Sequence, residues 1–230
     1  MTRLVYWDID GTLLTTARAG VPALEDAVEQ VTGVRPDLTS WHTAGLTDRM
    51  IVRDILADLG HADTTHDAAV LATYAARLPQ RLTEKRGQVL PAVLDVLTAL
   101  HEQPDVHNLL LTGNVRAGAQ AKLESYGLWQ FFEDGGFADD GFDRVDIARS
   151  LLARTAERYG SEAALEGVIV GDTPLDVACG LTLGVRVLGV ATGAFSRAQL
   201  EAAGAWQAVD VLPSAEDLLE LHDRREVAQS

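Results

Sequence analysis

The stretch LVYWDIDGT, at residues 4–12, decides which fold the sequence predicts. Its first four residues are apolar or aromatic and favour β structure, which is typical of a buried strand in a parallel sheet. The strand-like run ends at Asp8, and Gly11 permits a sharp backbone turn shortly after it. Asp8 and Asp10 lie two positions apart, so both side chains can point to the same side. The stretch therefore predicts a strand that presents a pair of carboxylates at its C-terminal end.

Two further strand-like runs end in polar turns of the same kind. Residues 108–111 lead into the turn TGN at 112–114, and residues 167–170 lead into GDT at 171–173. Further strands are expected at 185–190 and, more faintly, at 136–138, and helical patterns separate the strands at 115–126, 144–159 and 174–183. The alternation predicts an α/β fold, a Rossmann-like parallel sheet with right-handed crossovers and helices on both faces. Because ligands bind beyond the carboxyl ends of such strands, the three polar turns are expected to form one site.

The stretch from residue 17 to residue 86 interrupts this alternation. It contains helical patterns at 22–31, 48–59 and 67–86 and no convincing strand. We therefore predict a small all-helical cap domain at 17–86, inserted into an α/β core domain made of residues 1–16 and 87–230.

The composition restricts the partners that we expect. A hydrophobic fraction of 47% suits a packed core, and a formal net charge of −15 repels nucleic acids and anionic membrane surfaces. Binding of a phosphate ester would then depend on local features such as a metal ion, a helix N-terminus or a well-placed cation. The single cysteine, Cys179, and the absence of a long apolar run predict a cytoplasmic protein with no membrane partner. The oligomeric state stays open.

The aspartates are candidates for metal binding and catalysis. Asp8 and Asp10 suit a hard divalent cation and leave an oxygen free to attack a substrate, although Asp and Gly also occur in ordinary turns after strands. Asp172 would complete the metal site, and Asp176 in the next helix would orient the ligands from behind. The alternative for this second pair is helix capping by Asp and Thr173.

The turn at residues 112–114 combines a hydroxyl, a small residue and the start of a helix. Backbone N–H groups of Thr112, Gly113 and Asn114 would form an anion cradle, and the Thr112 hydroxyl would donate to a phosphoryl oxygen. The same tripeptide is also an unremarkable turn when it occurs alone.

Together these motifs closely resemble the haloacid dehalogenase (HAD) superfamily of phosphotransferases, and in particular its phosphoglycolate phosphatase-like members. The resemblance extends from Leu4 to about residue 191, and the insert resembles the cap that such members carry between their first two motifs. It implies that Asp8 is the nucleophile that becomes an aspartyl-phosphate. Asp10 would be the general acid and then the general base. Mg²⁺ would be held by the carboxylates of Asp8 and Asp172 and by the backbone carbonyl of Asp10.

One departure from the family pattern concerns the cation of the third motif, usually a lysine that holds the nucleophile and the phosphoryl group. The two lysines of the chain are Lys85 and Lys122, and neither falls in the expected place. Arg144, at the start of a helix, is the best candidate, and some similar members carry arginine there. Its guanidinium can bind bidentately, although it is not the point charge that lysine provides. The alternative is a surface ion pair with Asp140 or Asp143.

In the cap, residues 44–49 read as a loop that enters a helix, with Thr47 as its N-cap. The resemblance implies that such a loop faces the leaving group of the substrate. Gly45 would then allow close approach, and Thr47 or Arg49 would contact the substrate. A simple capped helix is an equal alternative.

The sequence as a whole predicts a Mg²⁺-dependent phosphatase, a phosphoric monoester hydrolase acting on a small phosphorylated metabolite. A phosphomutase of the same superfamily would use the same residues but would shield the aspartyl-phosphate from water. A dehalogenase needs neither the metal nor an acid at the second position, so Asp10 argues against it. The alternative from another class is a non-catalytic member that binds phosphate or a protein, against which the complete set of Asp8, Asp10, Thr112 and Asp172 argues.

Overall fold

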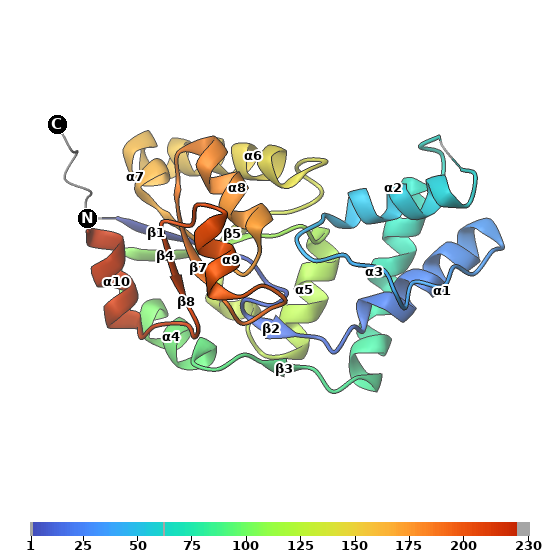
Figure 1. The fold of residues 1–230 in the computed structure, drawn as a ribbon, viewed down its shortest axis with the longest axis horizontal. Coiled ribbons are helices and arrows are strands. Elements are labelled where there is room, and N and C mark those ends of the chain that lie inside the picture. Colours follow the sequence, from blue (N-terminus) through green and yellow to red (C-terminus); the bar gives the residue numbers. More distant parts are fainter. Residues whose placement is uncertain (1, 62, 225–230) are drawn as a thin grey trace.

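The computed structural model describes residues 2–61 and 63–224. Within them the principal sheet has six parallel strands in the order β5-β4-β1-β6-β7-β8 (Figure 1). The strands are β1 (Arg3–Trp7), β4 (Val106–Leu111), β5 (Asp134–Gly136), β6 (Val168–Gly171), β7 (Arg186–Val190) and β8 (Gln207–Val209). Strands β4 and β5 lie on one side of β1, and the later strands β6, β7 and β8 lie on its other side. The strand order therefore reverses at β1. This is the position at which open parallel sheets bind ligands.

Alternating side chains of the strands pack against helices on the two faces of the sheet. In β1, Val5 and Trp7 belong to one buried apolar cluster, whereas Leu4 and Tyr6 belong to the other. Helices α4 (Val93–His101), α5 (Arg116–Ser125) and α10 (Ala215–Asp223) supply residues to the first cluster, and α6 (Arg144–Tyr159), α7 (Ser161–Glu166), α8 (Pro174–Leu183) and α9 (Arg197–Ala202) supply residues to the second. A short 3₁₀ turn, η1 (Trp129–Phe131), follows α5. The sheet is therefore covered on both faces, as predicted.

Three helices lie together beyond one end of the sheet, at the right of Figure 1. They are α1 (Gly20–Thr32), α2 (Asp48–Asp58) and α3 (Asp67–Glu84). The chain leaves the core through β2 (Leu14–Thr15) and returns through β3 (Gln88–Val89), and these two short strands pair antiparallel. The predicted division into a core and a cap at residues 17–86 agrees with this layout and stays a prediction.

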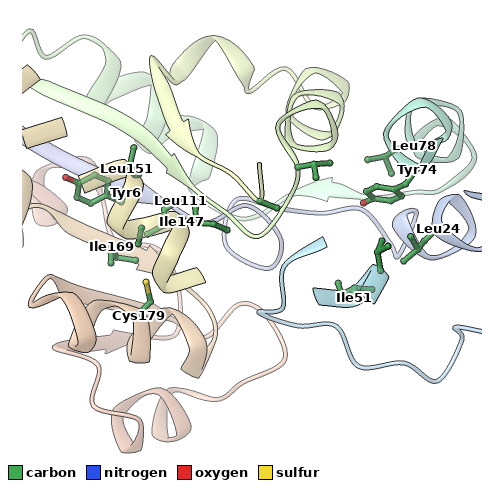
Figure 2. Packing of buried hydrophobic residues seen from close by; sticks show 14 of the residues in the cluster. Tyr6, Leu24, Ile51, Tyr74, Leu78, Leu111, Ile147, Leu151, Ile169 and Cys179 are labelled. Atoms are coloured by element: carbon green, nitrogen blue, oxygen red, sulfur yellow. The ribbon is translucent and has the colours of Figure 1, made fainter. Parts of the chain in front are cut away.

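Apolar packing continues from the sheet into the three-helix insert. Figure 2 shows Leu111 and Ile169 of the sheet, and Tyr74, Leu78 and Ile51 of the insert, which belong to one cluster of buried residues. In this structure the insert is therefore packed against the core.

The predicted α/β class and most of the predicted elements are observed, with α6 and α8 at the expected bounds. The faint strand expected at 136–138 lies instead at Asp134–Gly136, because its register is set by pairing with β4. Helices α4, α7 and α9, the 3₁₀ turn η1 and strands β2, β3 and β8 were not predicted. No helix in the described part of the chain is long and apolar enough to cross a membrane.

Candidate active site

The predicted motifs meet at the carboxyl edge of the central strands. The backbone N–H of Asp8 donates to Val170 O at 3.0 Å, so the residue after β1 lies beside the end of β6. The N–H of Thr112 donates to Gly136 O at 3.1 Å, which extends the ladder on the other side. Asp8, Thr112 and Asp172 are all buried. The sheet order thus brings together three turns that are far apart in the sequence.

Arg144 lies in the first turn of α6, and its side chain reaches the C-terminal ends of β1 and β4. Its Nη2 donates to Asp8 Oδ1 at 3.0 Å, its Nη1 donates to Asp176 Oδ1 and to Leu111 O, and its side chain is only 7% exposed. The surface pair that the sequence left open is not what the structure contains, since Asp143 instead caps α6 by accepting from Asp146 N. Arg144 is a buried counter-ion of the predicted nucleophile.

Three carboxylates crowd around this single guanidinium. Asp8, Asp172 and Asp176 each present an oxygen, and the three atoms lie within 4.8 Å of one another. Burial raises the pKa of Asp8 to about 7, although Arg144 opposes the rise. Burial, followed by the charges of Asp8 and Asp176, raises the pKa of Asp172 to about 8. An excess of buried carboxylate oxygens over cations is the donor set that a hard divalent cation neutralises, so these residues fit a divalent metal ion.

The carboxylate of Asp172 fits into a slot that two glycines form. A Cβ atom would lie 2.3 Å from Asp172 Oδ2 at Gly11, where φ is +86°, and 1.7 Å from it at Gly193. The hydroxyl of Thr12 donates to Asp172 Oδ1 at 3.3 Å. Gly193 was missed by sequence reasoning, because it belongs to a loop after β7 with no motif around it. These contacts fix the position of the Asp172 carboxylate relative to the turn at Gly11 and Thr12.

Asp176 has partners for both carboxylate oxygens. Its Oδ2 accepts from Thr173 N at 3.0 Å and from Thr173 Oγ1 at 2.7 Å, which completes a capping box at the start of α8. Its Oδ1 accepts from Arg144. Helix capping, the alternative considered from the sequence, is therefore present, and the same side chain also supports Arg144. Its predicted role behind the metal ligands is compatible with these contacts and stays a prediction.

The carboxylate of Asp10 lies outside the acidic group and contacts the turn after β4. Asp10 Oδ2 accepts from Asn114 Nδ2 at 2.8 Å and from Lys122 Nζ at 2.6 Å. Asn114 Nδ2 also donates to Thr112 Oγ1 at 2.7 Å. Lys122, which we set aside because it falls outside the third motif, is thus part of the site. The sequence offered only a weak signal, because Lys122 stands three positions after Ala119 and next to Leu123 and so falls on the apolar side of the predicted helix.

The predicted cap loop contacts the core rather than standing clear of it. Thr47 accepts from Met50 N at 3.1 Å, as an N-cap, and its hydroxyl donates to Phe142 O at 2.7 Å. Gly45 has φ of +77°, and a Cβ atom there would lie 2.8 Å from Leu175 Cδ1. Arg49 lies with its guanidinium carbon 5.8 Å from the centre of the Phe142 ring. Gly45 and Thr47 therefore have docking contacts, and the predicted substrate contacts of these residues are untested.

A neighbouring residue, Asp48, was also missed. Its N–H donates to Gly113 O at 2.7 Å, and its Oδ2 accepts from Val115 N at 2.8 Å. A Cβ atom at Gly113 would lie 2.6 Å from Leu46 O, so the turn predicted to bind phosphate also receives the cap. Burial raises the pKa of Asp48 to about 6, against the attraction of Lys122 and the Val115 N–H. The signal for this contact was absent from the sequence, because it joins two segments that are remote in the chain.

Comparison with known proteins agrees with this geometry. A family model described as haloacid dehalogenase-like hydrolase matches residues 5–180. The chain is 33% identical over 227 residues to "Probable phosphatase IndB" of Dickeya dadantii (strain 3937), covering 96% of each chain. It is 29% identical over 229 residues to phosphoglycolate phosphatase of Rhodospirillum rubrum, covering 95% of this chain and 91% of that one.

The fold is also shared with solved structures. A hydrolase from Pseudomonas syringae superposes with a TM-score of 0.69 at 20% identity, covering 96% of this chain and 97% of the other. The predicted family, the predicted α/β fold and the predicted class of enzyme, a phosphoric monoester hydrolase, are therefore confirmed. The chain belongs to the haloacid dehalogenase-like hydrolases.

Proposed function

We propose that this protein is a Mg²⁺-dependent phosphatase that hydrolyses a small phosphorylated metabolite through an aspartyl-phosphate on Asp8. The observation that carries the proposal is the position of Asp8, which is buried, paired with Arg144 and grouped with Asp172 and Asp176. A carboxylate attacks a phosphate dianion only where positive charge offsets the repulsion between them.

In the first step a carboxylate oxygen of Asp8 forms a bond to phosphorus while the bond from phosphorus to the ester oxygen breaks. The proton on Asp10 passes to the departing oxygen, which leaves as an alcohol. Mg²⁺ held by the Asp8 and Asp172 carboxylates and the Asp10 backbone carbonyl would neutralise charge on the phosphoryl oxygens. Arg144 and the donors of Thr112, Gly113 and Asn114 are proposed to bind the phosphoryl group.

In the second step water attacks phosphorus and the bond from phosphorus to Asp8 breaks. Asp10, now a carboxylate, accepts a proton from the attacking water, and inorganic phosphate leaves. The two steps restore Asp8 as a carboxylate and Asp10 as a carboxyl group. The contact of Asp10 with Lys122 and Asn114 supports this role, because both donors bind Oδ2 and leave the other carboxylate oxygen for proton transfer.

The class of substrate is inferred from the relatives. The similar protein of Rhodospirillum rubrum is named for phosphoglycolate, a small phosphorylated acid, and matches nearly the whole chain. The cap loop with Gly45, Thr47 and Arg49 is the proposed specificity region. A net charge of −15 also favours a partner that is small and that is recognised by local cations. We propose a cytoplasmic location, because the sequence has a single cysteine and no long apolar run.

The test is a panel of phosphorylated metabolites, with p-nitrophenyl phosphate as a generic substrate, measured with and without Mg²⁺. We expect release of inorganic phosphate that requires Mg²⁺ and that is lost in Asp8→Asn. Undiminished hydrolysis by that variant would refute the nucleophile. Transfer of phosphate to a second sugar hydroxyl in place of release would identify a phosphomutase instead.

A further inference from the structure

We propose that Lys122 is a positioning residue for Asp10, holding the carboxylate in the orientation from which it exchanges a proton with the leaving group and with water. The inference rests on the proposed function, in which Asp10 is the general acid and base. It assigns a role to a lysine that lies in helix α5, outside the three polar turns and away from the cation of the third motif.

Lys122, Asp10 and Asn114 form a hydrogen-bonded network that extends to Thr112. Its Nζ donates to Asp10 Oδ2 at 2.6 Å and to Asn114 Oδ1 at 2.6 Å. Asn114 Nδ2 donates to the same Asp10 oxygen at 2.8 Å and to Thr112 Oγ1 at 2.7 Å. Each member of the set is restrained by at least one other, so the rotamer of Asp10 is determined by two donors. Charge-assisted bonds of this length are among the strongest side-chain hydrogen bonds.

The two carboxylate oxygens of Asp10 differ in their hydrogen bonds. Both donors use Oδ2, and Oδ1 accepts no hydrogen bond from any residue in the described ranges 2–61 and 63–224. The Asp10 side chain is 43% exposed, whereas that of Lys122 is 7% exposed. The anchored oxygen therefore faces the protein, and the other oxygen is the one available for proton transfer.

Packing alone does not explain a lysine at this position. Position 122 lies on the inner side of α5 with buried Ala119 and Leu123. Burying an ammonium costs more free energy than burying an apolar side chain of similar volume, and buried ion pairs are often no more stabilising than apolar replacements. The energetic cost of Lys122 is therefore explained better by what it does to Asp10 than by the stability of the helix.

The cap places a second negative charge near the same ammonium. Asp48, at the start of α2, interacts electrostatically with Lys122 while its Oδ2 accepts from Val115 N at 2.8 Å. Lys122 consequently lies between an acid of the core and an acid of the docked insert. This arrangement ties the orientation of Asp10 to a docked cap.

The experiment compares two substrates in each variant by single-turnover kinetics with saturating Mg²⁺. One is an alkyl phosphate, whose leaving group must be protonated. The other is p-nitrophenyl phosphate, whose leaving group departs without a proton. Because general acid catalysis contributes roughly 10²- to 10⁴-fold, Lys122→Met should lose on the order of 10²-fold on the alkyl ester and far less on the aryl ester. Lys122→Arg should recover part of the loss, since arginine retains the charge but not its geometry.

The ratio of the two rates is taken within one preparation, so a partly unfolded variant does not distort it. Lys85→Met, which changes the exposed second lysine of the chain, is the matched control and should leave the ratio unchanged. In an Asp10→Asn background Lys122→Met should change the ratio little, because both changes remove the same contribution.

Equal losses on both substrates, or no loss, would overturn the positioning role of Lys122. A different result would show that the proposed function itself is wrong. If Asp10→Asn itself shows no dependence on the leaving group, then Asp10 is not the general acid, and the assignment beneath the inference is wrong.

Discussion

The substitution Asp48→Asn tests whether the docked cap buries an ionised carboxylate. Asn is isosteric with Asp, and its carbonyl oxygen can still accept from the Val115 N–H that Asp48 accepts from at 2.8 Å. Burial is the largest cause of the raised pKa of Asp48, which stands at about 6 against an ordinary value of 3.8. The charges of Asp10 and Asp139 add to the rise, and Lys122 opposes it.

The sign and size of the effect follow from linkage. Below pH 3.8 the group is protonated in both the folded and the unfolded chain and has no effect on stability. Between 3.8 and about 6 the unfolded chain loses its proton first, so the free energy of unfolding falls as pH rises. The loss is complete about one pH unit above 6 and amounts to at most about 3 kcal/mol, since each pKa unit corresponds to about 1.36 kcal/mol. This figure is a ceiling because opening of the cap alone would hydrate the carboxylate.

The assay is urea unfolding at several pH values from 4 to 8, with saturating Mg²⁺ so that the metal-binding acids contribute equally. Asp48→Asn should be more stable than the wild type by about 2 kcal/mol at pH 8, and the difference should shrink to about 0.5 kcal/mol or less at pH 4. Asp54→Asn, on the exposed side of the same helix, is the control. A difference that does not change with pH would refute the reasoning.

Three further predictions concern the site. Arg144→Met should lower the free energy of unfolding by about 3–5 kcal/mol in urea titrations, because it leaves the Asp8 carboxylate buried without its partner; a change below 1 kcal/mol would contradict this. Mg²⁺ at a hundred times its dissociation constant should stabilise the wild type by about 2.7 kcal/mol in thermal unfolding, and Asp172→Asn should abolish most of that gain. Gly113→Ala should disfavour docking of the cap by about 1–2 kcal/mol, seen as a fall of roughly tenfold in kcat/KM, because its Cβ would meet the backbone oxygen of Leu46.

The predictions that the structure supports best are those based on local pattern. An apolar run that ends in an aspartate marks the end of a buried parallel strand, and such ends share one edge of the sheet. That rule placed Asp8, Thr112 and Asp172 together without any knowledge of their contacts. The bounds of α6 and α8 were predicted from local signals as well, since a glycine follows each helix and Pro174 begins α8. The structure adds Asp143 and Thr173 as the N-caps of the two helices.

The site residues that the sequence did not predict are those whose role depends on a partner far away in the chain. A lysine in a helix normally extends into solvent, and nothing near Lys122 in the chain indicates that Asp10 lies beside it. Gly193 and Asp48 are similar cases, because their neighbours, Asp172 and the turn at Gly113, come from other parts of the chain. The surface pair considered for Arg144 was reasonable for a residue flanked by acids, but the side chain is buried and pairs with Asp8 and Asp176 instead.

By itself the sequence determined the class of fold, the order of the elements and the two carboxylates at the end of β1. These follow from hydrophobic periodicity and short-range backbone chemistry, which act over a few residues. The sequence offered Arg144 as the cation that faces Asp8, with a surface ion pair as the alternative, and the tertiary structure decided between the two. Only the tertiary structure showed that Lys122 faces Asp10. The reason is physical, because the partners of each ion pair are more than a hundred positions apart in the chain and meet only after the sheet has brought their strands and helices together.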